Sequence, residues 1–142
     1  MSTTSVSAPA TLLPPKPLAA RRIWFMGLLA AVLSAVANAV LFFAVVNGFG
    51  VSDAALDHVT PTIVYSVLGA LGGALVFAVI ARWARQPIRT FRLISLGVLI
   101  VSFIPDLFFA GATTPAGIPT LMLMHVVAAA IVVGLLTMPT QR

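Results

Sequence analysis

Two ionisable side chains, those of Asp106 and His125, lie inside long apolar stretches of this chain. Asp106 is fourteen residues past Arg92, and His125 is fourteen residues before Pro139. At a helical rise of about 1.5 Å per residue, both lie about 21 Å from the end of their stretch. An ionisable side chain at membrane depth is costly and by default indicates a function or a partner. We therefore expect Asp106 and His125 to form a pair.

Two further polar residues reach a similar depth in the other two apolar stretches. Asn38 lies sixteen residues past Arg22, and Tyr65 lies seventeen residues before Arg82, which corresponds to about 24 and 25 Å. The hydrocarbon core of a bilayer is about 30 Å thick, so one polar residue from each helix falls in its outer third. We expect Asn38 and Tyr65 to be hydrogen-bonding neighbours of the Asp–His pair.

The surroundings of Asp106 leave two interpretations open. Ser95, Ser102 and Asp106 are spaced seven and four residues apart, which puts them on one helix face. Pro105 removes a helix hydrogen bond and frees the carbonyl of Val101. Such a face must point towards protein, because lipid offers no hydrogen-bond partners. It is either a satisfied polar clamp that fixes the helix register, or a ligand or proton site in an outward-opening pocket.

Other chemistry has weaker support in the sequence. Met122, Met124 and His125 form a Met-x-Met-His motif, which suits Cu(I), but methionine also commonly fills gaps in cores. The chain has no cysteine, which excludes disulfides and thiol chemistry. No nucleophile elbow, phosphate loop, metalloprotease signature or dinucleotide motif is present. We predict no enzymatic activity, no metal and no cofactor.

The composition predicts the environment in which these residues work. Of the 142 residues, 61% are hydrophobic and 8% are charged, against about 25% charged residues in soluble globular proteins. Four membrane-spanning helices and short loops use about 110 to 125 residues, so there is room for one domain. The composition excludes an ordinary soluble domain, a disordered chain and a coiled coil.

The pattern of apolar stretches predicts an all-α integral membrane protein that forms a four-helix up-down bundle. Residues 1–18 are rich in Pro, Ser and Thr and are interpreted as a disordered cytoplasmic tail. Residues 19–142 form the transmembrane domain. Pro61, Pro87 and Pro119 stand near helix starts, where a missing N–H is harmless. The four helices are expected at residues 22–46, 62–83, 91–112 and 119–138.

The basic residues predict the orientation of the bundle. In this arrangement all eight Lys and Arg lie on one side, whereas Asp53, Asp57 and His58 lie on the other. The positive-inside rule then gives cytoplasmic N- and C-termini. The net charge of +5 is thus read as a topological signal and as attraction to anionic lipid headgroups, with no nucleic acid involved. The interface anchors are Trp24, Trp83, Arg22, Arg82, Arg85, Arg89 and Arg92.

The first apolar stretch has a second interpretation. Arg21 and Arg22 precede an apolar run that reaches the small residues Ala35, Val36 and Ala37, a pattern typical of a cleaved signal peptide. Apolar residues continue to Val46, however, beyond the length of a signal peptide. We expect an uncleaved helix, and mass spectrometry of the mature N-terminus would distinguish the two.

Small residues at four-residue spacing predict how the helices pack. Such spacing puts small side chains on one helix face, where they let two membrane helices approach closely. We expect packing within the bundle, and the alternative is the face of a homo-oligomer. The residues concerned are Gly27, Ala31, Ala35 and Ala39, then Gly69 and Gly73, and finally Ala130 and Gly134.

The motifs Ile104-Pro105-Asp106-Leu107 and Leu123-Met124-His125 carry a resemblance. With the helix layout over residues 22–138, the chain resembles an uncharacterised family of small bacterial membrane proteins with four predicted helices. The resemblance implies the bacterial cytoplasmic (inner) membrane and no assigned activity. Small multidrug exporters share the length, but their coupling acid lies in the first helix, where this chain has Asn38.

These observations predict a multi-pass protein that is non-enzymatic and serves a binding or accessory role. Its one specific feature is the polar cluster around Asp106 and His125. The alternative is a small oligomeric transporter in which Asp106 is the titrating residue. A lone four-helix bundle encloses little volume, so transport would require an oligomer.

Overall fold

The structure is a computed structural model that describes residues 20–48, 58–108 and 116–138. Within these ranges it is all-α, with no strand. The elements are α1 (Ala20–Phe43), the π-helical turn η1 (Ala44–Gly48), α2 (Val59–Trp83), α3 (Pro87–Phe108) and α4 (Gly117–Leu136). The predicted four-helix fold is confirmed. The predicted tail at residues 1–18 and the acids Asp53 and Asp57 lie outside the described residues.

All four helices begin a few residues earlier than predicted, α1 at Ala20 instead of residue 22. α2 begins at Val59 instead of residue 62, α3 at Pro87 instead of residue 91, and α4 at Gly117 instead of residue 119. Proline is tolerated anywhere in the first turn, because the N–H groups there have no partner within the helix. Pro61, Pro87 and Pro119 therefore each lie within the first turn of a helix.

All four helices are long and apolar enough to cross a membrane. The shortest, α4, has 20 residues, which at about 1.5 Å per residue spans about 30 Å, the thickness of the hydrocarbon core. Large apolar side chains cover the outside of the bundle, among them Phe25, Leu68 and Leu96. This outward apolar surface fits lipid as the surrounding solvent.

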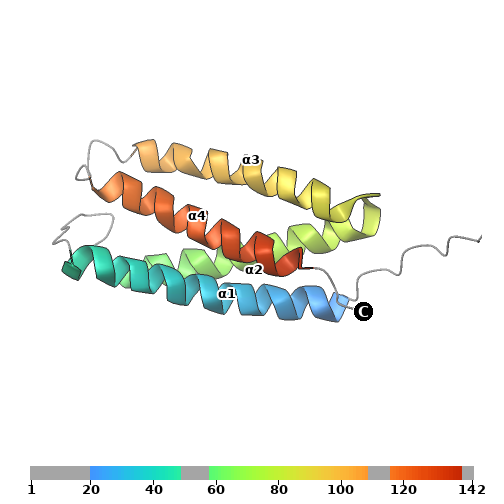
Figure 1. Ribbon diagram of the computed structural model, residues 1–142, viewed down its shortest axis with the longest axis horizontal. Coiled ribbons are helices and arrows are strands. Elements are labelled where there is room, and N and C mark those ends of the chain that lie inside the picture. The colour runs from blue at the N-terminus through green and yellow to red at the C-terminus, as the bar shows by residue number, and fades with distance from the viewer. Residues whose placement is uncertain (1–19, 49–57, 109–115, 139–142) are drawn as a thin grey trace, which may run out of the picture.

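The helices alternate in direction, and α2 crosses the bundle. Figure 1 shows α2 beginning beside α1 and ending beside the start of α3, while α4 lies between α1 and α3. α1 packs most extensively on α2 and then on α4, and α3 has the sparsest packing. We call the end with the α2–α3 connection the hairpin end, and the end where α1 and α3 finish the loop end.

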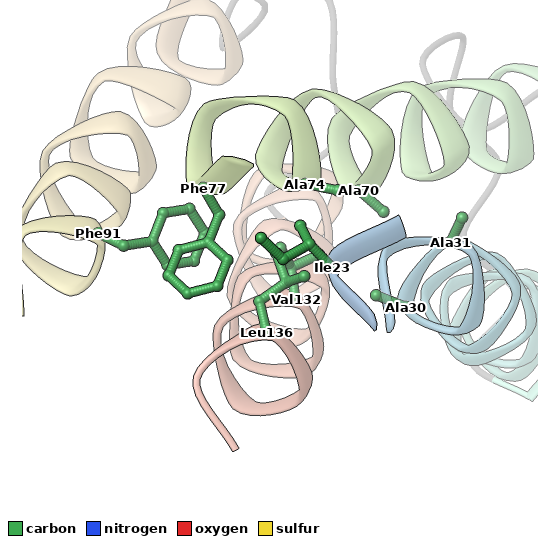
Figure 2. Packing of buried hydrophobic residues seen from close by; sticks show 9 residues of the cluster. All are labelled: Ile23, Ala30, Ala31, Ala70, Ala74, Phe77, Phe91, Val132 and Leu136. Carbon is green, nitrogen blue, oxygen red and sulfur yellow. The ribbon is translucent and has the colours of Figure 1, made fainter. Parts of the chain in front are cut away.

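A close-packed apolar cluster occupies the middle of the bundle and its hairpin end (Figure 2). Phe77 and Phe91 join α2 to α3 with ring centroids 4.9 Å apart. α1 approaches α2 so closely that a Cβ added at Gly27 would lie 2.5 Å from the Cβ of Ala74. The cluster consists of Ile23, Ala30, Ala31, Ala70, Ala74, Phe77, Phe91, Val132 and Leu136.

The small-residue stripes meet a neighbouring helix only in part. Gly27 and Ala31 are buried, Ala35 and Ala39 are half-buried, and a Cβ on Gly73 would lie 2.8 Å from Val132. The expectation needs correcting elsewhere, because Ala130 is exposed and a Cβ on Gly69 or Gly134 would meet nothing within 4 Å. On α2 the ridge against α1 is Ala70 and Ala74, one residue further along than Gly69 and Gly73.

Two of the predicted interface arginines cap α4 at the hairpin end. Arg22 donates from Nη2 to the carbonyl oxygen of Met138 at 2.6 Å, and Arg92 donates to Oγ1 of Thr137 at 3.2 Å. Cations are stabilising at a helix C-terminus, where the last carbonyl groups lack partners. The remaining anchors, Trp24, Trp83, Arg82, Arg85 and Arg89, are exposed at the same end.

Candidate functional site

A cavity of about 440 Å³ lies at the loop end and receives side chains from all four helices. The alternating helix directions bring the end of α1 and of α3 together with the start of α2 and of α4. The volume falls within the range of small-molecule sites, about 300 to 1,000 Å³. The lining residues are Asn38, Pro61, Thr62, Tyr65, Ser66, Asp106, Leu121, Met124, His125 and Ala128.

Asp106 and His125 face each other across the α3–α4 contact. Oδ2 of Asp106 lies 3.2 Å from Nδ1 of His125, which in turn lies 2.9 Å from the carbonyl oxygen of Leu121. A carbonyl oxygen only accepts hydrogen bonds, so Nδ1 carries the proton and donates it to Leu121. The structure thus brings the two predicted partners together. Leu121, whose carbonyl accepts the hydrogen bond, lies four residues before His125 on α4.

This pair is incomplete as a hydrogen bond. Nδ1 of His125 has one proton, which it donates in a hydrogen bond to the carbonyl oxygen of Leu121. Oδ2 of Asp106 has no hydrogen-bond partner, although only 6% of the residue is exposed. The carboxylate and the imidazole therefore lie side by side without the alignment that a strong hydrogen bond needs. A buried acceptor without a donor costs about 1 to 3 kcal/mol.

Asn38 belongs to a second polar group, formed with α2. Its Nδ2 donates to Oγ of Ser66 at 2.9 Å, and Ser66 donates to the carbonyl oxygen of Thr62 at 2.7 Å. Because the serine proton is already used, Oγ of Ser66 needs a donor, which fixes the orientation of the Asn38 amide. Oδ1 of Asn38 is left buried without a partner, in a residue that is 4% exposed.

The expected four-residue cluster is therefore corrected to two separate groups that share one cavity. Asn38 bonds to Ser66 and not to the Asp–His pair, and Tyr65 is 73% exposed at the edge of the cavity. On a helix, Ser66 is the residue after Tyr65 and points about 100° away from it, so only one of the two can face α1. The small size of Ser66 suits the interior.

Thr62 and Ser66 are polar lining residues that the sequence did not predict, and Pro61, Leu121 and Ala128 are apolar ones. Thr62 and Ser66 lie four residues apart, and that spacing puts both on one face of α2. Ser102, which the sequence placed with Asp106, instead donates to the carbonyl oxygen of Leu99 in its own helix. Short hydroxyl side chains bond readily to their own backbone. A polar helical pattern alone therefore does not tell a residue that faces a site from one that bonds within its own helix.

The chemistry of the cavity is set by few polar groups on a mostly apolar lining. Within the described ranges, no group of three or more His, Cys, Asp or Glu residues could hold a metal ion. Of the Met-x-Met-His motif, Met124 and His125 line the cavity and Met122 does not. What the cavity offers is a mostly apolar wall with a few convergent polar atoms, the usual character of a small-molecule site.

Comparisons with known proteins give a family for the chain. The model of a family of unknown function (DUF6069) matches residues 18–142. No curated protein and no solved structure matches the chain.

Proposed function

The chain belongs to DUF6069, a family of unknown function, and we propose from its own cavity that it is a non-enzymatic binding protein of the membrane. The ligand site is the loop-end cavity, with Asp106 and His125 on one wall and Asn38 on another. Residues on four helices converge there, so a bound molecule would contact every helix of the bundle. The four helices position the lining residues, and the apolar cluster towards the hairpin end packs the helices against one another.

One observation carries this proposal: two buried acceptor atoms in one cavity have no hydrogen-bond partner. They are Oδ2 of Asp106 and Oδ1 of Asn38. A polar clamp that served structure alone would pair its own groups, because each unmet buried acceptor lowers stability by about 1 to 3 kcal/mol. Buried polar groups left unpaired in a native structure point to a function or a missing partner.

A second candidate, a small oligomeric transporter with Asp106 as the titrating residue, has one observation in its favour. Asp106 lies on α3, and Phe91 and Asp106 are the buried residues of that helix. A sparsely packed helix that carries an intramembrane acid can change position at low cost. A monomer by light scattering in detergent would count against this candidate.

The orientation and surroundings follow as part of the proposal. We propose that the hairpin end faces the cytoplasm of a bacterial cell, since Arg82, Arg85 and Arg89 are exposed there beside Trp83. Basic residues at a membrane surface attract anionic headgroups and mark the cytoplasmic side. The loop-end cavity would then open towards the outer leaflet.

The chain has no cysteine, which allows a direct test with single cysteines. Ala128 lines the cavity, whereas Val126, two residues away on α4, is exposed on the outer surface that lipid would cover. The reagent is methyl methanethiosulfonate, a small neutral compound that reacts with thiolates. A thiol in apolar surroundings stays protonated and unreactive.

In proteoliposomes, Ala128→Cys should react at least about ten times faster than Val126→Cys, because a thiolate forms only where water reaches it. Equal, slow rates would mean that the cavity is sealed and that the polar residues only hold the helices in register. Circular dichroism and size-exclusion chromatography on both variants would establish that each has the parent fold.

A further inference from the structure

The hydrogen-bonding atoms left over in the cavity are acceptors. Oδ1 of Asn38 and Oδ2 of Asp106 have no hydrogen-bond partner, although the second lies 3.2 Å from Nδ1 of His125, and both residues are more than nine-tenths buried. Nδ1 of His125 is committed to the carbonyl oxygen of Leu121. In a neutral imidazole the other nitrogen, Nε2, then carries a lone pair, so it is a third acceptor.

Two donors of the cavity bond to groups within the protein. Ser66 donates its proton to the carbonyl oxygen of Thr62, and one of the two N–H groups of the Asn38 amide donates to Ser66. Two hydroxyl groups also line the cavity, that of Thr62 and that of Tyr65, which lies at the exposed edge. None of these groups donates to Oδ1 of Asn38 or Oδ2 of Asp106. A molecule that satisfies these two acceptors must therefore bring donors with it, and a positive charge would also balance the carboxylate.

We propose that the cavity binds the primary ammonium group of an amphipathic amine, an inference that rests on the binding function proposed above. An ammonium group has three N–H donors and no acceptor, which matches an excess of acceptors beside one carboxylate. A hydrogen bond between charged groups is shorter and about twice as strong as one between neutral groups. Asp106 and Asn38 are its anchoring residues.

The size and walls of the cavity favour an organic cation over a bare metal ion. A volume of about 440 Å³ is far larger than one ion needs. Pro61, Leu121, Met124 and Ala128 supply apolar lining. An alkyl chain attached to the ammonium group would lie against these side chains, because burying apolar atoms on an apolar wall gains dispersion energy.

The position of the cavity suggests how such a molecule enters. α2 and α3 lie together at the hairpin, where Phe77 contacts Phe91, and diverge from there along the bundle (Figure 1). Tyr65 on α2 and Asp106 on α3 line the cavity beyond the point of divergence. Tyr65 is 73% exposed, so an amine with its tail in the lipid would reach the cavity beside this residue of α2.

The test measures how well amines protect Ala128→Cys from methyl methanethiosulfonate. Four probes with the same twelve-carbon chain are compared at equal mole fraction in dodecyl maltoside micelles: dodecylamine at pH 7, dodecyltrimethylammonium, dodecanol and dodecane. The first has charge and donors, the second charge alone, the third a donor alone, and the fourth neither. Matching the chain keeps partitioning into the micelle similar.

Dodecylamine should give half-protection at a mole fraction at least about ten times lower than any of the other three probes. This result follows from the need for both a charge and N–H donors. Equal protection by dodecyltrimethylammonium would overturn the role of the donors, and equal protection by dodecanol would overturn the role of the charge. Protection by sodium ions alone would replace the amine by a metal ion and overturn the proposal.

Substitutions then assign the recognition to the named residues. Asp106→Asn, made in the Ala128→Cys chain, should raise the half-protecting mole fraction of dodecylamine at least about tenfold and leave dodecanol unchanged. Thr120→Ala is the matched control, because Thr120 is buried on α4, bonds to its own helix at Ala116 and is outside the cavity lining. An equal effect of both substitutions would contradict recognition by Asp106.

The two proposals fail in different ways. If Ala128→Cys does not react at all, the cavity is sealed and the binding function itself is wrong. If it reacts but no amine protects it, the cavity is open and only the ligand class is wrong. The wild-type series of probes needs no change at Asp106, so a folding defect in Asp106→Asn does not block the test.

The same ammonium chemistry could come from a lipid headgroup or from a free amine. Proteoliposomes of phosphatidylethanolamine present a primary ammonium group, whereas those of phosphatidylcholine present a quaternary one. Slower reaction of Ala128→Cys in phosphatidylethanolamine assigns the site to the lipid, and protection by dodecylamine in phosphatidylcholine assigns it to a free amine. Each of these results supports the proposal, and the absence of both overturns it.

Discussion

At the hairpin end, apolar side chains from all four helices close the bundle, whereas at the loop end the buried apolar cluster consists of Phe42 and Met124. The first region uses small residues and one pair of aromatic rings to bring helix backbones together. The second places Asn38, Asp106 and His125 around a cavity. Close packing is therefore concentrated away from the site.

The two ends also differ in how completely their polar groups are hydrogen-bonded. At the hairpin end, Arg22 and Arg92 donate to the end of α4, and Thr137 donates to the carbonyl oxygen of Val133. At the loop end, buried acceptors remain without donors. Sites for ligands commonly trade stability for function, so substitutions at the first end should lower stability and substitutions at the second should change binding.

The largest loss of stability is expected from Phe77→Ala. Phe77 is fully buried and packs on Phe91, and its removal leaves a void between α2 and α3. We expect the free energy of unfolding to fall by about 3 kcal/mol, measured by titration with sodium dodecyl sulfate in mixed micelles. Phe108→Ala, at a residue that is 84% exposed, is the control and should change it by less than about 0.5 kcal/mol. Similar losses for both would contradict the difference between the ends.

Gly27→Ala should have the next largest effect. The added methyl group would lie 2.5 Å from the Cβ of Ala74, so α1 and α2 must move apart, at a cost of about 1 to 3 kcal/mol. Ala74→Gly removes the opposing methyl group, and the double variant should recover most of the loss. Gly69→Ala is the control, because nothing lies within 4 Å of that position. A double-mutant cycle with zero coupling would show that the two helices do not meet there.

The smallest effect, and one of opposite sign, is expected from Ser34→Ala. Oγ of Ser34 is fully buried without a hydrogen-bond partner, and the residue is not part of the cavity lining. Removing an unpaired hydroxyl group should raise the free energy of unfolding by about 1 kcal/mol. Dodecylamine protection should stay unchanged, in contrast to Asp106→Asn. A fall in stability would mean that Ser34 has a polar partner in the membrane.

Depth arithmetic on the sequence found the chemically important pair but not its neighbours. Asp106 and His125 could be matched because each lies fourteen residues from a marked helix end, and helices of equal rise carry such residues to equal depth. Depth says nothing about rotation about the helix axis. The partner of Asn38 is therefore Ser66 rather than Tyr65, although the two are neighbours in the chain.

Rotation also explains the small-residue stripes. On α2, the pairs Gly69–Gly73 and Ala70–Ala74 both have the small-xxx-small spacing, and the spacing alone does not choose between them. The structure turns Ala70 and Ala74 to α1. The choice depends on the fit of whole helix surfaces, in which Gly27 provides the space for Ala74.

By itself, the sequence determined the number of helices, their apolar character and the level at which each polar residue lies, because these depend on composition and on a constant rise per residue. The tertiary structure alone decided which faces meet, since that depends on side chains from helices distant in sequence. Through that choice it paired Asn38 with Ser66 and left two acceptors open to a cavity. Oδ1 of Asn38 and Oδ2 of Asp106 are these two atoms, and our functional proposal rests on them.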